Sequence, residues 1–228
     1  MKSTLSSSSP QDLRRGSKLP DSRLKACGND GRPFPAVFLD RDGVINEIIF
    51  HQEMGIIETP FTAAQFKLKK DVGRAIRRLN RAGFKVVVTS NQPGLAMKHF
   101  SQKTLDKITN KMKRLLSREG ARLDGIYYCT HHPTKGHGAL KKMCACRKPK
   151  PGLLKIAAKE MSLDLKRSYM VGDSILDVMA GKGAGVKTLL LAHLKCDLCS
   201  LMARRGIKPD YLVKDLRGAV SRILSEKS

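Results

Sequence analysis

Two carboxylates stand where a buried strand is expected to end. The stretch 36–46 reads AVFLDRDGVIN, so a short apolar run leads into Asp40, Arg41, Asp42 and Gly43. Such a run is typical of a strand buried on both faces of a parallel sheet. Ligands bind beyond the carboxyl ends of these strands, and Gly43 lets the backbone turn sharply there. The pattern predicts that both acids reach one ligand, whereas a lone D-x-D would indicate only a solvated loop.

A second apolar run, FKVVVTS at 84–90, also ends on polar side chains. Ser90, Asn91 and Gln92 follow one another in the sequence SNQPG. Their hydroxyl, amide and backbone N–H groups are donors suited to phosphate oxygens. Because parallel strands end at one edge of a sheet, we expect these donors to lie beside the first two acids.

Acids and bases follow later in the chain. SYMVGD at 168–173 predicts a strand that ends at Asp173, and Asp177 lies one helical turn further on. Carboxylate oxygens of this kind are the hard ligands that Mg²⁺ prefers. Arg147 and Lys148 precede a proline-stiffened loop and a predicted helix start, an arrangement that suits an anion. In so basic a chain, the alternative for this pair is a solvated basic loop.

Sulfur and imidazole ligands are concentrated in YYCTHHPTKGHGALKKMCAC. Three cysteines and a histidine there form a C-x-H pair and a C-x-C pair separated by a twelve-residue loop: Cys129, His131, Cys144 and Cys146. This spacing fits a tetrahedral Zn²⁺ site of the Cys₃His kind, in which the ion is structural because no position is open. His132 and His137 remain alternative nitrogen ligands. The CxxC pair at Cys196 and Cys199 is expected to be incidental, with a second metal site or a redox pair as alternatives.

The residues with chemical potential need a scaffold that gathers them. Six apolar runs predict strands, at 36–39, 84–90, 125–129, 168–173, 187–191 and 210–213. Helical patterns occupy 69–82, the segment after Ser101, 151–161 and the C-terminal segment from Leu216. Strand–helix alternation predicts an α/β fold with a doubly wound, mostly parallel sheet. Residues of mixed polarity at about 46–66 are expected to form a short flap over the site, so that no large cap domain is needed.

Composition sets wider limits. The chain has 228 residues, with 44 Lys and Arg against 20 Asp and Glu, a formal net charge of +24. Residues 1–35 are rich in Ser and basic residues and are expected to be a flexible tail, followed by one domain at 36–228. No apolar run approaches the roughly 20 residues of a membrane span, no secretory signal is visible, and the cysteine usage suits a cytoplasmic protein. The positive field attracts phosphorylated metabolites and nucleic acids alike.

The order of these motifs resembles the haloacid dehalogenase-like phosphatase superfamily, from residue 36 to about 191. DRDGVIN, SNQPG, YYCTHHP, CACRKPKPG and SYMVGD are similar to its D,D-heptose 1,7-bisphosphate phosphatase branch. The histidinol-phosphate phosphatases share most of these motifs, but their shorter metal loop favours the heptose branch here. The flap sequence NEIIFHQEMGIIETPF is longer than is usual in that branch.

The resemblance implies a cytoplasmic, monomeric, Mg²⁺-dependent D-glycero-D-manno-heptose 1,7-bisphosphate 7-phosphatase with a structural Zn²⁺. It implies that Asp40 attacks phosphorus and that Asp42 is the general acid and base. Ser90 and Lys148 would stabilise the phosphoryl oxygens. The remaining roles are a Mg²⁺ site and substrate contacts. Asp40, Asp173 and the Asp42 carbonyl would hold the ion, and Asp177 would support Lys148 or the ion. The substrate contacts would come from Ser90, Asn91, Gln92, Arg147 and Lys148.

Two other functions remain to be weighed. A nucleic-acid 3′-phosphatase would suit the charge, but only 5% of residues are aromatic and Trp is absent, so no platform for stacking bases is visible. A catalytically inactive basic binding module is disfavoured by the intact set of acids and Lys148. Nucleic acid is therefore not the expected substrate, although the charge does not exclude it.

Overall fold

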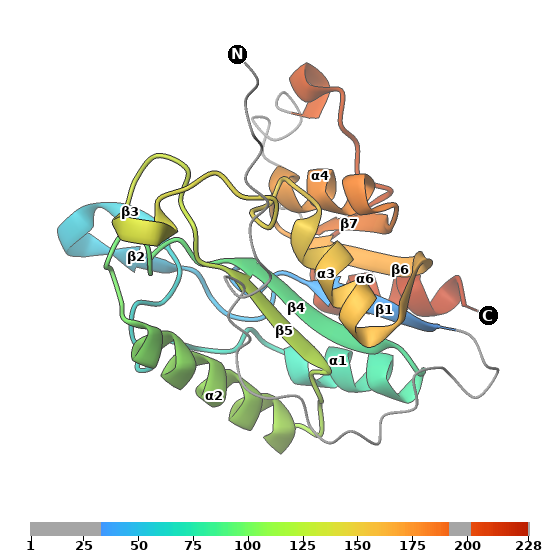
Figure 1. Cartoon of the computed structure of the whole chain (residues 1–228). Coiled ribbons are helices and arrows are strands. Elements are labelled where there is room, and N and C mark those ends of the chain that lie inside the picture. The colour runs from blue at the N-terminus through green and yellow to red at the C-terminus, as the bar shows by residue number, and fades with distance from the viewer. Residues whose placement is uncertain (1–32, 192–201, 228) are drawn as a thin grey trace, which may run out of the picture.

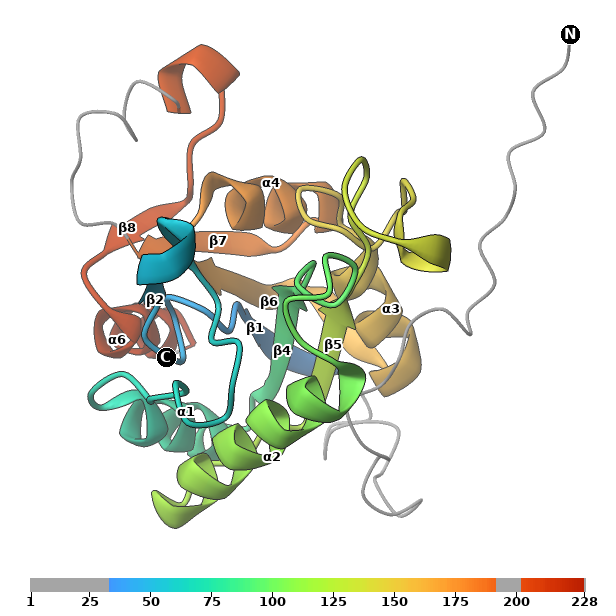
Figure 2. The ribbon, with the colours of Figure 1, turned by 90° about the vertical axis from the view of Figure 1, so that its left-hand side faces the viewer.

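The computed structural model describes residues 33–191 and 202–227 (Figures 1 and 2). Most of the predicted N-terminal tail and the pair Cys196 and Cys199 lie outside the described residues. The first strand begins at Phe34, so it includes the last two residues that the sequence assigned to the tail.

Six parallel strands form the central sheet. Their order is β5-β4-β1-β6-β7-β8, and every neighbouring pair is parallel. The strands are β1 (Phe34–Leu39), β4 (Lys85–Asn91), β5 (Gly125–Cys129), β6 (Leu163–Gly172), β7 (Lys187–Leu191) and β8 (Tyr211–Val213). All six predicted strands are therefore confirmed, and β1 lies near the centre of the sheet.

Strand β6 starts five residues earlier than the sequence predicts. Its first part, LDLKR, is polar, and it pairs with β1 through Phe34↔Leu163 and Pro35↔Asp164. The register then shifts between Pro35 and Val37. The buried Ser168 hydroxyl accepts the Ala36 N–H at 2.8 Å, so that donor stays satisfied where the ladder is irregular.

Helices cover both faces of the sheet (Figure 1). On one face lie α1 (Val72–Arg81), α2 (Gln102–Arg118) and α6 (Leu216–Ser225), which share a buried cluster with Val37 and Leu39. On the other face lie α3 (Gly152–Met161) and α4 (Ile175–Ala184), and α3 and α4 pack with Ala36 and Phe38. Both sets of β1 side chains are buried, which explains the uninterrupted apolar run. None of the helices at 33–191 and 202–227 has the length and apolarity of a membrane span.

Local signals account for several helix ends. Ser101 caps α2 as predicted, because its side chain accepts the Thr104 N–H at 3.2 Å. Pro151 directly precedes α3 instead of lying in its first turn. Helix α4, to which the sequence analysis gave no bounds, begins with a capping box between Ser174 and Asp177.

The predicted flap is a small antiparallel hairpin. It consists of β2 (Ile49–His51) and β3 (Ile56–Glu58), with a short 3₁₀ turn at Gln52–Met54 between them. The His51 ring contacts the Thr59 carbonyl oxygen at 2.9 Å and stacks on Phe61 with ring centroids 3.7 Å apart. These contacts fix the base of the hairpin, while Phe50 and Ile57 on the hairpin are exposed.

Candidate active site

Three acids and one lysine meet at the carboxyl edge of the sheet. Asp40 follows β1, Asp173 follows β6, and Asp177 lies in the first turn of α4. One carboxylate oxygen from each lies within 4.8 Å of the others. Lys148, from the loop before α3, places Nζ 3.0 Å from Asp40 Oδ1 and 2.5 Å from Asp177 Oδ1. Three segments that are distant in the sequence, around residues 40, 148 and 173–177, therefore contribute to one constellation.

Burial and crowding determine the electrostatics of this constellation. Burial, reinforced by the negative charges of Asp40 and Asp177, raises the pKa of Asp173 to about 7. Burial also raises the pKa of Asp177 to about 6. Burial alone would lower the pKa of Lys148, but the charges of Asp177 and Asp40 outweigh it and raise that pKa. Three crowded carboxylates against one lysine leave negative charge to neutralise, and their hard oxygen ligands fit Mg²⁺.

Both oxygens of Asp177 are already engaged. Oδ1 accepts from Lys148 Nζ, and Oδ2 accepts from the Ser174 backbone N–H at 3.1 Å. The contacts agree with the expectation that Asp177 orients Lys148. Asp40 and Asp173 lie next to each other, and neither has hydrogen bonds to both of its carboxylate oxygens from other described residues.

Asp42 lies in a cradle of donors. Its Oδ1 accepts from Asn46 Nδ2 and Thr59 Oγ1, each at 3.0 Å. Its Oδ2 accepts from Gln92 Nε2 at 2.7 Å. Arg41 Nη2 donates to both oxygens, at 3.1 and 3.0 Å. This cradle fixes the orientation of the Asp42 carboxyl group.

Three residues that the sequence patterns did not predict also belong to this site: Arg41, Asn46 and Thr59. Arg41 is fully buried; burial tends to lower its pKa, but the neighbouring Asp42 charge outweighs this and raises it. Its Nη2 also donates to Gln92 Oε1 at 2.8 Å and to the Thr59 hydroxyl. The signal that could have revealed it is an arginine inside an otherwise buried stretch, since a buried guanidinium needs a carboxylate partner.

The polar residues at the carboxyl end of β4, and Gln92 directly after it, support the site. Ser90 is buried, and its Oγ accepts from Gln92 Nε2 at 3.2 Å. The Asn91 side chain exchanges two hydrogen bonds with the Lys148 backbone, at 3.0 and 3.1 Å. Asn91 thereby positions Lys148, and Gln92 positions Asp42, so both expected substrate contacts have their amide groups engaged within the protein.

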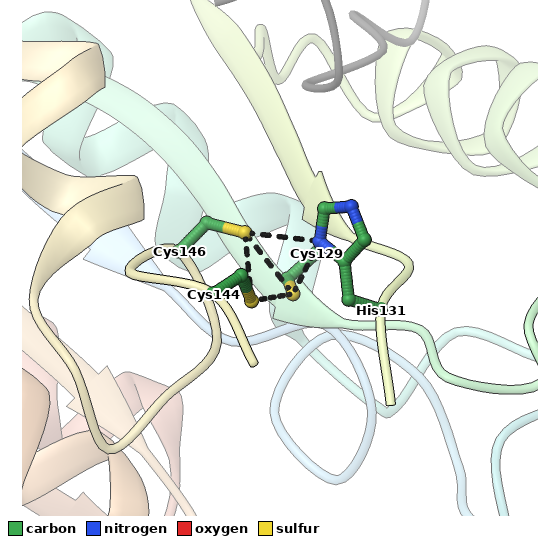
Figure 3. Close-up of side chains that lie close together, drawn as sticks. All are labelled: Cys129, His131, Cys144 and Cys146. Carbon is green, nitrogen blue, oxygen red and sulfur yellow. Dashed lines mark hydrogen bonds between the residues drawn. The ribbon is translucent and has the colours of Figure 1, made fainter. Parts of the chain in front are cut away.

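Cys129, His131, Cys144 and Cys146 converge beside this edge, as Figure 3 shows. The three sulfur atoms lie 3.3–3.6 Å apart, and His131 Nδ1 lies 3.3 Å from Cys146 Sγ. A tetrahedron with Zn–S bonds of about 2.3 Å needs sulfur atoms about 3.8 Å apart, so this donor set fits Zn²⁺. All three cysteines are free thiols.

The imidazole alternatives are resolved by position. His131 joins the sulfur cluster, whereas His132 Nδ1 accepts the backbone N–H groups of Thr134 and Lys135 at 3.2 and 2.8 Å. Among the described residues, neither His132 nor His137 belongs to the cluster. Arg147 Nη1 donates to the His131 carbonyl oxygen at 3.2 Å, which links the metal loop to the active-site loop.

Several known proteins are similar to this chain in sequence and in fold. Residues 145–219 match a HAD-hydrolase-like family model. D-glycero-beta-D-manno-heptose-1,7-bisphosphate 7-phosphatase from Haemophilus ducreyi is 41% identical over 159 residues, which cover 69% of this chain and 82% of that protein. The enzyme of the same name from Escherichia coli K12 is 39% identical, with 70% and 79% covered.

The chain belongs to this phosphatase family. A crystal structure of D,D-heptose 1,7-bisphosphate phosphatase from B. bronchiseptica, complexed with magnesium and phosphate, is 30% identical and has a TM-score of 0.69, with 85% of this chain and 99% of that chain covered. As a member of the family, the chain is a phosphoric monoester hydrolase of the haloacid dehalogenase-like type. The resemblance drawn from the motifs is confirmed.

Because Gly43 has no side chain, the loop that follows β1 can lie close to Asp173. Gly43 has φ +77°, and an added Cβ would lie 1.7 Å from Asp173 Oδ2. We expect Gly43→Ala to displace Asp173 and to lower kcat/KM about 100-fold or more, because misplacements of about 1 Å can cost that much.

Gly185→Ala is the matched control, measured in the same phosphatase assay and by thermal unfolding. Gly185 has φ +79° and no atom within 4 Å of an added Cβ. Gly185→Ala also places alanine in a left-handed backbone conformation, which costs about 1 kcal/mol, but the added methyl group meets no other atom. The activity of this variant should therefore stay near that of the parent. Equal activities of the two variants would refute the close approach of Gly43 to Asp173.

Proposed function

We propose that this phosphatase removes the 7-phosphate of D-glycero-β-D-manno-heptose 1,7-bisphosphate through a phosphorylated Asp40. The observation that carries the proposal is the meeting of Asp40, Lys148 and Asp173 at one sheet edge, with Asp42 held two residues from the nucleophile. Relatives about 40% identical bear the name of that activity.

The proposed metal is Mg²⁺, held by the Asp40 and Asp173 side chains and the Asp42 carbonyl. When bound, the ion would neutralise charge as a Lewis acid between the carboxylate nucleophile and the phosphate dianion. Burial and the nearby charges of Asp40 and Asp177 raise the pKa of Asp173 to about 7, and a bound cation would favour its ionised form.

Phosphoryl transfer in this proposal begins at Asp40. One carboxylate oxygen of Asp40 bonds to phosphorus as the bond to the sugar oxygen breaks. Lys148 Nζ lies 3.0 Å from Asp40 Oδ1 and so lies close to the reacting phosphoryl group. Donation from Lys148 and Ser90 to the phosphoryl oxygens would lower the barrier, and preorganised donors are commonly worth about 3–4 kcal/mol each.

Asp42 serves as the proton carrier. It protonates the departing alkoxide and then takes a proton from the water that hydrolyses the aspartyl-phosphate. Arg41, Asn46, Thr59 and Gln92 hold its carboxyl group in place. Because Thr59 follows the flap hairpin, the flap is coupled to the orientation of the general acid.

Substrate selection falls to the residues around this centre. Arg147 would bind the second phosphate of the sugar through a bidentate fork, while Asn91 and Gln92 orient Lys148 and Asp42. We further propose that the enzyme acts as a monomer in the cytoplasm.

The second proposed ion is a structural Zn²⁺ bound by Cys129, His131, Cys144 and Cys146. The support for this assignment is the 3.3–3.6 Å spacing of the three sulfur atoms, with His131 Nδ1 3.3 Å from Cys146 Sγ. The loop at 129–146 is polar and would gain its fixed shape from such an ion. Through Arg147 and the His131 carbonyl oxygen, that shape extends to the active site.

A substrate panel tests the proposed function directly. Phosphate release should be fastest from heptose 1,7-bisphosphate, compared with histidinol phosphate and a 3′-phosphorylated oligonucleotide at equal concentrations. We expect kcat/KM for the heptose to exceed both others by about 100-fold, since buried polar groups left unpaired by a wrong substrate discriminate strongly. Faster turnover of either competitor would replace the heptose assignment.

Asp40→Asn tests the nucleophile. The amide keeps the shape of the side chain but cannot form an acyl phosphate, so turnover should fall to background while thermal unfolding stays within a few degrees of the parent. Asp106→Asn on the exposed side of α2 makes the same chemical change away from the site and should retain activity. Substantial phosphatase activity in purified Asp40→Asn protein would refute the assignment.

Metal content tests the zinc assignment. Elemental analysis should give about one zinc per chain, and Cys144→Ser should remove it and lower the melting temperature. His132→Ala changes a neighbouring residue outside the cluster and should keep the zinc. Folded parent enzyme without zinc, or a Cys144→Ser variant with undiminished zinc, would contradict the structural role.

A further inference from the structure

The positive charge of the helices is distributed unevenly between the two faces of the sheet. Helices α1, α2 and α6 together contain twelve Lys and Arg residues and one acid. Helices α3 and α4, on the other face, contain three bases and two acids. A small phosphorylated substrate at the carboxyl edge does not account for charge concentrated on one face.

Helix α2 arranges most of its bases in one ridge. Lys103, Lys107, Lys111, Arg114 and Arg118 follow one another at intervals of three or four residues, so they share one side of the helix. The buried residues Leu105, Ile108, Met112 and Leu116 occupy the opposite side. At 1.5 Å per residue, the basic ridge is about 22 Å long.

Helix α1 lies beside α2 on the same face and adds a second row (Figure 1). It contains four arginines and no acid: Arg74, Arg77, Arg78 and Arg81. The Arg77 side chain reaches the end of α2, where a Cβ on Gly120 would lie 3.2 Å from Arg77 Cδ. There, a cleft of about 590 Å³ is lined by residues that include Arg114, Ser117 and Arg122.

Several of these charges are available to a partner. Arg74 pairs with Asp71, and Arg122 pairs with Asp124. Lys107, Arg114 and Arg118 are exposed, and within 33–191 and 202–227 they form no ion pair. Unpaired guanidinium and ammonium groups in a row are suited to successive phosphates.

We propose that α1 and α2 form a binding face for the phosphate backbone of a nucleic-acid duplex. Neither helix contains an aromatic residue, so bases cannot be stacked on it and single strands gain no advantage. The large exposed apolar side chains of the described residues lie elsewhere, on the flap, at Met143 and at Leu212. This face therefore has no large apolar side chain that could insert into a lipid bilayer. Binding is therefore electrostatic and independent of base sequence.

The face is separate from the catalytic centre. The carboxyl ends of α1 and α2 lead into the amino ends of β4 and β5, whereas Asp40 follows the carboxyl end of β1. A duplex bound near Arg114 and Arg118 therefore lies toward the edge of the sheet opposite the active site. The interaction places the enzyme on a polyanion without using that polyanion as a substrate.

Two triple variants with equal charge loss test the proposal. Lys107→Gln, Arg114→Gln and Arg118→Gln together neutralise the ridge. Lys155→Gln, Lys159→Gln and Arg167→Gln neutralise three exposed bases outside the α1–α2 face. Fluorescence anisotropy of a labelled 20-base-pair DNA is measured with the full chain at several salt concentrations between 50 and 200 mM.

The ridge variant should bind the duplex at least tenfold more weakly than the control variant. The slope of log K against log salt should become shallower by two to three, since each phosphate contact on a duplex contributes about 0.9. An equal loss of affinity in both variants would show that only the total charge of the protein matters, and it would overturn the proposal. Tighter binding of the parent to the separated strands, or to vesicles with 30% phosphatidylserine, would overturn the choice of duplex. Hydrolysis of the sugar phosphate should be unchanged in both variants, so this test stands apart from the proposed function.

Discussion

The buried ammonium group of Lys148 is the contact on which the catalytic architecture depends. It is 2% exposed and is held by Asp177 Oδ1 at 2.5 Å, Asp40 Oδ1 at 3.0 Å and the Thr89 carbonyl oxygen at 2.9 Å. A buried charge is tolerated only when it is paired and hydrogen-bonded, and removal of one partner commonly costs about 3–5 kcal/mol. Because these partners belong to β4, α4 and the end of β1, one side chain ties three elements to the loop before α3. The same contact thus stabilises the fold and fixes the position of the Asp40 carboxylate.

Charge balance then separates the roles of the acids. Lys148 compensates Asp177 and Asp40, which leaves Asp173 buried near like charges with a pKa raised to about 7. Asp42 stands apart, because Arg41 compensates it and three further side chains hydrogen-bond to it. In the proposed mechanism, this difference suits a cation beside Asp40 and Asp173 and proton transfer at Asp42. The two acids in D-R-D thus have different electrostatic surroundings, because Lys148 faces Asp40 and Arg41 faces Asp42.

Sequence patterns predicted the scaffold well because burial on both faces imposes its own signature. The apolar runs located all six strands, and strand ends placed Asp40, Ser90 and Asp173 at one edge. Patterns could not show which way the following side chains point, so the hydrogen bonds by which Asn91 holds Lys148 and Gln92 holds Asp42 were not predicted. The role of Thr59 could not be predicted, because Thr59 and Asp42 are seventeen positions apart and the fold of the flap brings them together. The polar start of β6 was missed because pairing with β1, and not apolarity, extends it.

The total charge of +24 indicates attraction to anions but gives no location, and location decides what the charge can do. At the carboxyl edge, the buried acid Asp177 fixes the position of Lys148. The ridge of α2 has the opposite character, since its exposed Lys107, Arg114 and Arg118 form no ion pair with any residue that the structure describes and follow the helical period. Fixed charge favours one small ligand in one orientation, whereas a solvated row favours an extended anion in many registers. The exposed bases of α1 and α2 lie on one face of the sheet, whereas Lys148 lies at its carboxyl edge. An excess of base on these helices is therefore compatible with a selective phosphatase site at that edge.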